Sequence, residues 1–156
     1  MKVRVLCMGK THEQFIKDGI EKYLRYLKPY ADVEFQELRE EKIQDLKDAP
    51  RVRQREAEKI EKALPPAAHV VALDERGREF TSHEFAEFLN KVTESGTREM
   101  AFVIGGAMGL DEAVTKNART VIALSRWTFT HEMARLVLLE QLYRAYTIIK
   151  GRPYHY

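Results

Sequence analysis

Two kinds of segment alternate along this chain, and this alternation is the feature that most limits its fold. Short apolar runs rich in β-branched residues are typical of buried strands, and we expect five of them, at residues 3–8, 33–38, 69–73, 100–104 and 120–124. Between them lie segments whose apolar side chains recur every three or four residues, which indicates helices at 12–28, about 50–64, 82–92, from 110 onward and 131–150. Strands that alternate with helices predict an α/β domain with a mostly parallel sheet.

The length and the composition favour a single domain, residues 1–156. A chain of 156 residues with 44% apolar residues is ordinary for one globular domain. Its one cysteine, Cys7, cannot form an internal disulfide or a zinc site of several thiolates. No apolar run approaches the roughly 18 residues of a membrane span, and the first residues lack the features of a signal peptide. We therefore expect a cytoplasmic protein without membrane contact.

Charge is unevenly distributed along the chain although the net charge is only +2. Residues 1–30 carry a net +4 and residues 97–156 a net +3, whereas 31–64 carry −2 and 65–96 carry −3. If the two ends meet in space, they form a modest positive face; otherwise the pattern is ordinary surface charge. The charged segment 40–64 has only a narrow apolar stripe, so we expect its helix to be solvated or mobile.

Ligands of parallel sheets bind beyond the carboxyl ends of the strands, which directs attention to three loops, 74–79, 105–109 and 125–130. The run from Gly105 to Gly109 follows a strand and precedes a helix. It is neither a P-loop nor a dinucleotide fingerprint, because no Gly-Lys-Ser/Thr follows and Phe129 stands where an acidic residue is needed. Two interpretations remain, a tight turn that needs positive φ and a close backbone approach to a small ligand.

The last expected helix is apolar around most of its circumference, which indicates burial on more than one side. The sheet and a second subunit are the two candidate covers, and we expect both, hence a homodimer. Arg135 lies in the middle of the apolar arc. Either its side chain stays solvated in the first turns of the helix, before the buried core begins, or it faces an anionic ligand or a subunit boundary.

The five histidines are not spaced as metal ligands, so we expect no metal site. His131 stands at the start of the last helix beside a ligand-side loop, as a cap, a packing residue or a catalyst. The chain ends in Tyr154, His155 and Tyr156, groups that can exchange protons or stack on bases.

Four ordered motifs resemble those of one family. They are Ile104-Gly105-Gly106-x-x-Gly109, Leu124-Ser125-x-x-Thr128-Phe129-x-His131-x-x-x-Arg135, Glu140-Gln141-Leu142-Tyr143-Arg144-Ala145 and Pro153-Tyr154-His155. Together they resemble the RlmH family, ribosomal RNA large-subunit methyltransferases of the SPOUT superfamily. The similarity covers the whole chain, and the ordered set is specific where any one motif is not.

The resemblance implies a parallel α/β domain with a deep C-terminal trefoil knot, with the knot and the cofactor site within about residues 70–150. It implies a homodimer with S-adenosylmethionine (SAM) as methyl donor and no metal. The implied acceptor is N3 of a pseudouridine in a stem-loop of 23S rRNA, presented by the assembled ribosome.

By matching position, the resemblance also implies site residues. The SAM pocket is formed by Leu73, Gly105, Leu124, Ser125, Arg126, Trp127, Thr128 and Phe129. Arg135, Tyr143, Arg144, Tyr154 and His155 match positions near the acceptor side of the dimer interface. For the chemistry, His131 and His155 are candidate bases for the N3 proton, and Arg135 or Arg144 could stabilise the resulting anion or hold a phosphate.

Two positions depart from the family pattern. Thr130 stands where related sequences typically have proline, so the loop before the last helix is expected to be less rigid. The chain ends in Tyr156 where relatives often end in a basic residue, which removes one possible phosphate contact.

Three other functions remain open at this point. The same fold could methylate a tRNA base or ribose, or the pocket could have decayed in a non-catalytic RNA-binding dimer. A nucleotide-dependent enzyme such as an NAD oxidoreductase is disfavoured by the glycine spacing.

Overall fold

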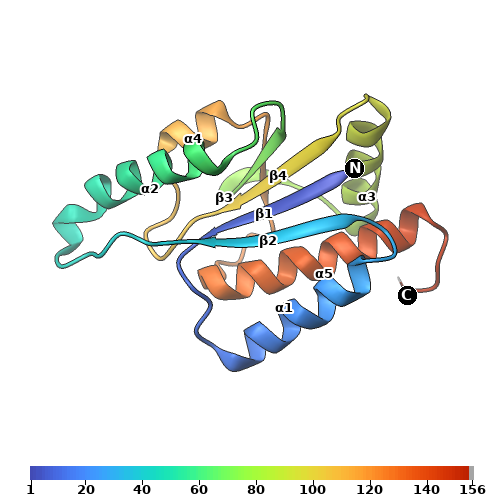
Figure 1. The fold of residues 1–156 in the computed structure, drawn as a ribbon, viewed down its shortest axis with the longest axis horizontal. Coiled ribbons are helices and arrows are strands. Elements are labelled where there is room, and N and C mark those ends of the chain that lie inside the picture. Colours follow the sequence, from blue (N-terminus) through green and yellow to red (C-terminus); the bar gives the residue numbers. More distant parts are fainter. Residues whose placement is uncertain (155–156) are drawn as a thin grey trace.

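A computed structural model describes residues 1–154 and shows one five-stranded sheet flanked by helices (Figure 1). The strands are β1 (Lys2–Met8), β2 (Asp32–Leu38), β3 (His69–Glu79), β4 (Glu99–Ile104) and β5 (Thr120–Ala123). They lie in the order β2-β1-β4-β3-β5, and every pair is parallel. The predicted α/β class with a parallel sheet is confirmed.

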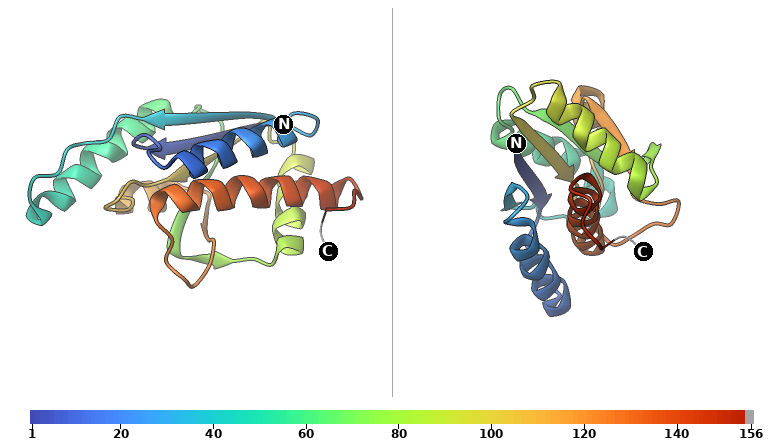
Figure 2. Two further views of the ribbon diagram at one scale, coloured as in Figure 1. Left: turned by 90° about the horizontal axis from the view of Figure 1, so that it is seen from below. Right: turned by 90° about the vertical axis from the view of Figure 1, so that its right-hand side faces the viewer.

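Helices cover both faces of the sheet. They are α1 (Gln14–Leu27), α2 (Ala49–Ala63), α3 (Ser82–Glu94), α4 (Glu112–Asn117) and α5 (His131–Ile149), with a single 3-10 turn, η1 (Leu46–Asp48), before α2. α1, α3 and α5 pack against one face, and α2 and α4 against the other. Figure 2 shows α1 and α5 running side by side.

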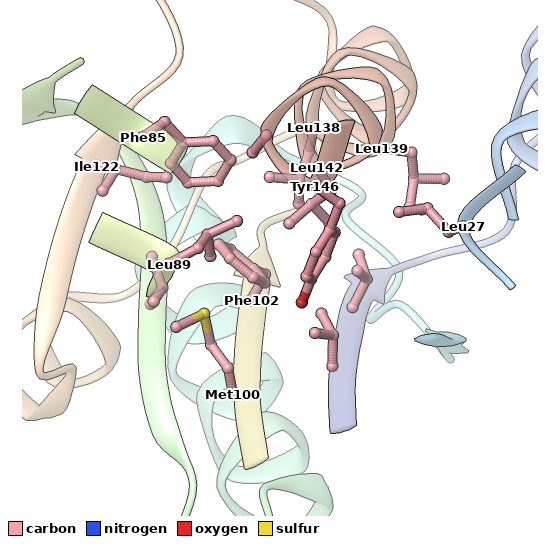
Figure 3. Close-up of a cluster of buried hydrophobic side chains, with 14 of the residues drawn as sticks. Leu27, Phe85, Leu89, Met100, Phe102, Ile122, Leu138, Leu139, Leu142 and Tyr146 are labelled. Carbon is pink, nitrogen blue, oxygen red and sulfur yellow. The ribbon is translucent and has the colours of Figure 1, made fainter. Parts of the chain in front are cut away.

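Alternation along the strands divides the core into two clusters. In β1, Val3, Val5 and Cys7 enter the larger cluster with α1, α3 and α5, while Met8 enters the smaller one with α2 and α4. Figure 3 shows the larger cluster, in which leucines of α5 meet the sheet and the side chains of α3.

The apolar circumference of α5 is covered on several sides by elements of its own chain. The sheet and a second subunit were the two candidate covers, but α5 lies against the sheet, α1 and α3 of its own chain. Its buried residues are thus covered within one chain, which confirms the sheet as one of the two expected covers, and the second subunit stays a prediction.

The segment before β3 also differs from expectation. The helix expected to be solvated or mobile is α2, and it packs on the sheet through Val52, Glu56 and Ile60. A narrow apolar stripe on α2 is enough here, because α2 has to cover only one flank of the sheet together with the short α4.

β3 is longer than the predicted strand 69–73. It pairs with β4 at its start and with β5 further on, and its register against β5 shifts between Leu73 and Arg78. Residues 74–79, expected to be a loop, are thus a bulged continuation of the strand. Gly77 makes this possible, because a Cβ there would lie 2.6 Å from the backbone carbon of Ile122.

Local signals account for several helix boundaries. Thr81 forms a capping box with Glu84 at the start of α3. Within residues 1–154, no helix combines the length and the apolar content needed to cross a bilayer.

Candidate functional site

A large cavity of about 1240 Å³ lies beyond the carboxyl ends of β3, β4 and β5. Its walls come from the end of β3, the loop after β4, the loop after β5 and the first turn of α5, with α2 at one side. This is the edge of a parallel sheet where ligands bind. The predicted ligand loops 105–109 and 125–130 both line it, as do Leu73 to Arg76 from the bulged strand.

The glycine-rich loop forms a tight turn. The backbone N–H of Gly109 donates to the carbonyl of Gly106 at 3.0 Å, and Gly109 has a φ of +77°. A Cβ on Gly105 would lie 2.7 Å from the carbonyl carbon of Gly109, so only glycine fits there. The tight-turn interpretation is confirmed, and the turn presents its backbone to the cavity.

The loop after β5 offers hydrogen-bond donors that the described part of the chain leaves unused. The side chain of Ser125 accepts from the backbone N–H of Trp127 at 2.9 Å. Within residues 1–154, the backbone N–H groups of Arg126, Thr128 and Phe129 have no hydrogen-bond partner. Trp127 is 82% exposed. A ligand in the cavity can therefore meet free donors and an aromatic face.

The predicted cofactor residues are brought together with one exception. The cavity is lined by seven of the eight, namely Leu73, Gly105, Leu124, Ser125, Trp127, Thr128 and Phe129. The exception is Arg126, whose side chain turns outward and donates to Glu79 at 3.2 Å.

The cavity rim is mainly acidic, with six carboxylates, Glu13, Asp74, Glu75, Asp111, Glu112 and Glu132. Asp74 is tied to Arg76 by two side-chain bonds of 3.0 and 3.1 Å and by the Arg76 backbone N–H. The donated hydrogen bond from the Arg76 side chain lowers the pKa of Asp74. Such a rim favours a ligand that carries positive charge.

His131 lines the cavity at the first residue of α5. Burial lowers the pKa of His131 below its ordinary value, and the nearby charge of Arg135 lowers it further. The imidazole is therefore neutral at pH 7 and able to accept a proton. Thr130 caps α5 by accepting a hydrogen bond from the backbone N–H of Met133 at 3.1 Å. Where related sequences typically have a proline, this chain therefore has a helix cap.

Arg135 is fully buried, with 0% of its surface exposed. It donates to the Met8 carbonyl at 2.7 Å, to the Thr11 hydroxyl at 2.8 Å and to the Glu37 carboxylate at 3.3 Å. The first interpretation, a solvated Arg135 side chain, is wrong. The anion it faces belongs to this chain, and its visible role is to tie α5 to β1 and β2. Its predicted place near the acceptor stays a prediction.

Glu132 is a positioning residue that the sequence reasoning missed. Its carboxylate accepts from the backbone N–H groups of His12 and Glu13, at 2.8 and 3.0 Å, at the start of α1. Burial acts to raise the pKa of Glu132, but these two hydrogen bonds and Arg135 outweigh it and lower the pKa. No local signal could have identified this cap, because the capping residue lies 119 positions away along the chain.

The remaining predicted residues form a separate cluster near the end of α5. Tyr154 donates to Glu140 at 3.2 Å, and its ring lies 4.6 Å from that of Tyr143 and 4.8 Å from the guanidinium of Arg144. Arg144 also donates to Glu140 at 2.7 Å. His155 lies outside the described residues. Arg144 follows His131 by 13 positions on one helix, which separates the two by about 20 Å at 1.5 Å per residue.

Within residues 1–154, no group of three or more His, Cys, Asp or Glu side chains is arranged to hold a metal ion. The features that the structure does provide are a large cavity, two irregular loops and a neutral histidine. These define a parallel α/β domain built to bind a small ligand at the carboxyl edge of its sheet.

Comparison with known proteins gives the family. A family model described as "Predicted SPOUT methyltransferase" matches residues 1–155. The chain belongs to the SPOUT methyltransferase family.

Similar proteins match this chain from end to end. The protein named "Ribosomal RNA large subunit methyltransferase H" in Geobacter metallireducens is 46% identical over 156 residues, which cover 100% of this chain and 99% of that protein. The protein of the same name in Geobacter sulfurreducens is also 46% identical and is covered completely in both chains. Its counterpart in Symbiobacterium thermophilum is 44% identical over 160 residues, covering 99% of each chain.

Two solved structures share the fold. A probable methylase family protein from Haemophilus influenzae Rd KW20 matches with a TM-score of 0.59 at 15% identity, covering 99% of this chain and 70% of that one. A probable methyltransferase from Bordetella pertussis Tohama I matches with a TM-score of 0.57 at 16% identity, covering 92% and 95%. At these identities the likeness concerns the fold alone.

Proposed function

We propose that this protein transfers the methyl group of SAM to N3 of a pseudouridine in a stem-loop of 23S rRNA on the assembled ribosome, in the cytoplasm. Family membership supports methyl transfer, and the name of its 43–46% identical relatives supports ribosomal RNA of the large subunit as acceptor. The observation that carries the proposal is the cavity at the carboxyl ends of β3 to β5, framed by two loops with free backbone donors.

The lining of the cavity fits SAM in chemistry. Leu73, Leu124 and Phe129 supply apolar surface for an adenine ring, and the unpartnered N–H groups of the loop after β5 supply donors for its ring nitrogens. The acidic rim suits the ammonium and sulfonium charges of the cofactor. When bound, SAM supplies a methyl group on an already activated leaving group, so neither a metal nor a covalent enzyme intermediate is required.

The residues of this chain have two tasks in such a transfer. They must hold donor and acceptor in line, which can lower the barrier by several kcal/mol. They must also receive the N3 proton, and neutral His131 in the cavity wall is suited to accept it. His155 remains a second candidate base.

The active form is proposed to be a homodimer, and the argument is one of distance. Arg144 and Tyr154 lie about 20 Å along α5 from His131, too far to act in the cavity of their own chain. A two-fold partner placed against α5 can bring its own Arg144 and tail to this cavity. Exposed aromatic residues beside α5, Phe15 and Tyr26 on α1, leave an apolar surface for such a contact.

The trefoil knot is proposed for the segment from β3 to α5. The chain runs from β3 to β4 and then crosses β3 to form β5 at the sheet edge. A return of α5 through the loop that this crossing leaves would close the knot around the cavity.

The experiment that tests the proposed function supplies methyl-labelled SAM with purified tRNA, free 23S rRNA and intact ribosomes. Label in 23S rRNA from ribosomes, mapped to N3 of a pseudouridine, is the expected result. Label in tRNA would instead support the alternative SPOUT acceptor. Absence of label in every RNA, together with no thermal stabilisation by SAM, would indicate a non-catalytic RNA-binding protein.

A further inference from the structure

The cavity is larger than the donor alone requires. Its volume of about 1240 Å³ exceeds the roughly 300–1,000 Å³ of pockets that hold one small molecule. On one side it extends to Arg53 and Gln54 of α2. Figures 1 and 2 show that α2 projects past the sheet at this edge. There is space here for part of the acceptor.

The charges that line the cavity single out one side chain. Six of its lining residues are carboxylates, and two, Arg53 and Arg76, are arginines. Arg76 is engaged by Asp74 through a pair of hydrogen bonds. Within residues 1–154, Arg53 makes no hydrogen bond, ion pair or cation–π contact. Arg53 is therefore the one unpaired arginine in the lining of a mainly acidic cavity.

The packing of α2 does not explain why an arginine stands at position 53. The helix packs through Val52, Glu56 and Ile60, and Arg53 is only partly buried beside them. Three other cations of this helix are paired, since Lys59 and Arg55 meet Glu41 and Arg51 meets Asp48. Arg53 lies toward the cavity instead, next to Gln54, which also has no hydrogen-bond partner among the described residues.

We infer that Arg53 binds a backbone phosphate of the RNA acceptor and positions the target nucleotide over the cavity. This rests on the proposed function, because it takes the acceptor to be RNA. An acidic rim repels RNA, so a phosphate is held best where an unpaired guanidinium faces it. Phosphate contacts of this kind fix the register of a nucleic acid without reading its bases. Gln54 adds a neutral donor beside it.

The test compares Arg53→Gln and Arg53→Lys with the wild-type chain in methyl transfer to ribosomes at several salt concentrations and constant magnesium. In Arg53→Gln, KM for ribosomes should rise roughly tenfold, with kcat within about twofold. The slope of log KM against log salt should fall by about one, as expected for one lost phosphate contact. Arg53→Lys keeps the charge and should keep the wild-type slope.

Arg98→Gln is the matched control, because Arg98 is an exposed arginine whose side chain has no partner among residues 1–154, and it lies just before β4 at the opposite edge of the sheet. It should leave KM and slope unchanged. Calorimetry should show wild-type SAM affinity in Arg53→Gln. A weakened SAM affinity would assign Arg53 to the donor site and overturn the inference, as would an unchanged KM and slope in an active enzyme. A wild-type chain that methylates no RNA would contradict the proposed function instead.

Discussion

At the scale of single residues, the most constrained side chain of the protein is Arg135. A buried guanidinium is costly unless its hydrogen bonds are satisfied. Here a hydroxyl, a carbonyl and a carboxylate satisfy its two terminal nitrogens, and only Nε is left without a partner among the described residues. The network fixes the first turns of α5, and with them His131, against the ends of β1 and β2.

Arg135→Ala should lower the free energy of unfolding by roughly 3–5 kcal/mol, because it removes a fully buried side chain with its packing and its three hydrogen bonds. Urea denaturation at pH 7 measures this. Glu34→Gln is the control, since Glu34 pairs with Lys2 and Arg4 at the surface, and it should cost about 1 kcal/mol or less. Equal losses in the two variants would contradict the role given to Arg135.

His131 predicts a pH dependence. Its pKa is lowered by burial, so it stays neutral, and able to accept a proton, down to below the ordinary histidine value of about 6.5. The rate kcat should therefore fall only as the pH drops through that lowered pKa. Folding stability should fall over the same acid range, because the unfolded chain binds the proton more tightly.

His131→Gln should reduce kcat by about 10²–10⁴ and remove the acid limb of the profile. Methyl transfer at saturating SAM between pH 5 and 8 gives both quantities. His12→Gln, an exposed histidine nearby, should keep the acid limb and shift it only slightly, because the charge of His12 is the smallest of the causes that act on the pKa of His131. A profile that His131→Gln does not alter would exclude His131 as the base.

At the scale of elements, β3 decides the shape of the cavity. It lies between β4 and β5, and its bulge between Leu73 and Arg78 carries the strand past the cavity instead of ending there. Gly77 lets the bulged strand and β5 approach each other closely. The loop after β5 is thereby anchored at both ends, by this pairing and by the Thr130 cap of α5.

Gly77→Ala should destabilise the protein by roughly 1–3 kcal/mol, because the new methyl group meets backbone atoms of Val121 and Ile122 that cannot rotate away. SAM affinity should fall as well, since β5 must move together with its loop. Thermal unfolding and calorimetry measure the two effects. Gly106→Ala, whose Cβ would find its nearest neighbour at 3.5 Å, should change stability by less than about 0.5 kcal/mol.

At the scale of the whole molecule, the two ends of the chain form one layer. α1 and α5 lie side by side, so the basic segments 1–30 and 97–156 do meet in space, as the first of the two charge interpretations required (Figure 2). The same layer carries Tyr154 and Arg144, about 20 Å along α5 from the cavity. Under the proposed function, a complete site then needs two chains.

This arrangement predicts complementation between two inactive variants. A chain that lacks residues 153–156 should bind SAM but transfer no methyl group, and Gly105→Val should fail because its side chain has no room beside Gly109. Coexpressed in equal amounts, the two should recover about a quarter of wild-type activity, from one intact site in each mixed dimer. Full activity of the truncated chain, or no recovery in the mixture, would contradict a shared site.

The order and type of the elements follow from local sequence, because the spacing of apolar residues reflects the period of a helix or a strand. The α/β class and the five strands were predictable in this way, and so were the glycine turn and the loop that line the cavity. Family motifs placed Leu73 and His131 at the same edge of the sheet.

Only the tertiary structure decided what individual polar residues do. The partners of Arg135 lie 98 to 127 positions away in the sequence, and the two residues before α1 that donate to Glu132 lie 119 to 120 positions away. The same apolar pattern on α5 fits a second subunit or the neighbouring helices α1 and α3, and the fold uses the helices. A pattern records which side of an element is buried, but the identity of the covering atoms depends on chain segments that meet only after folding.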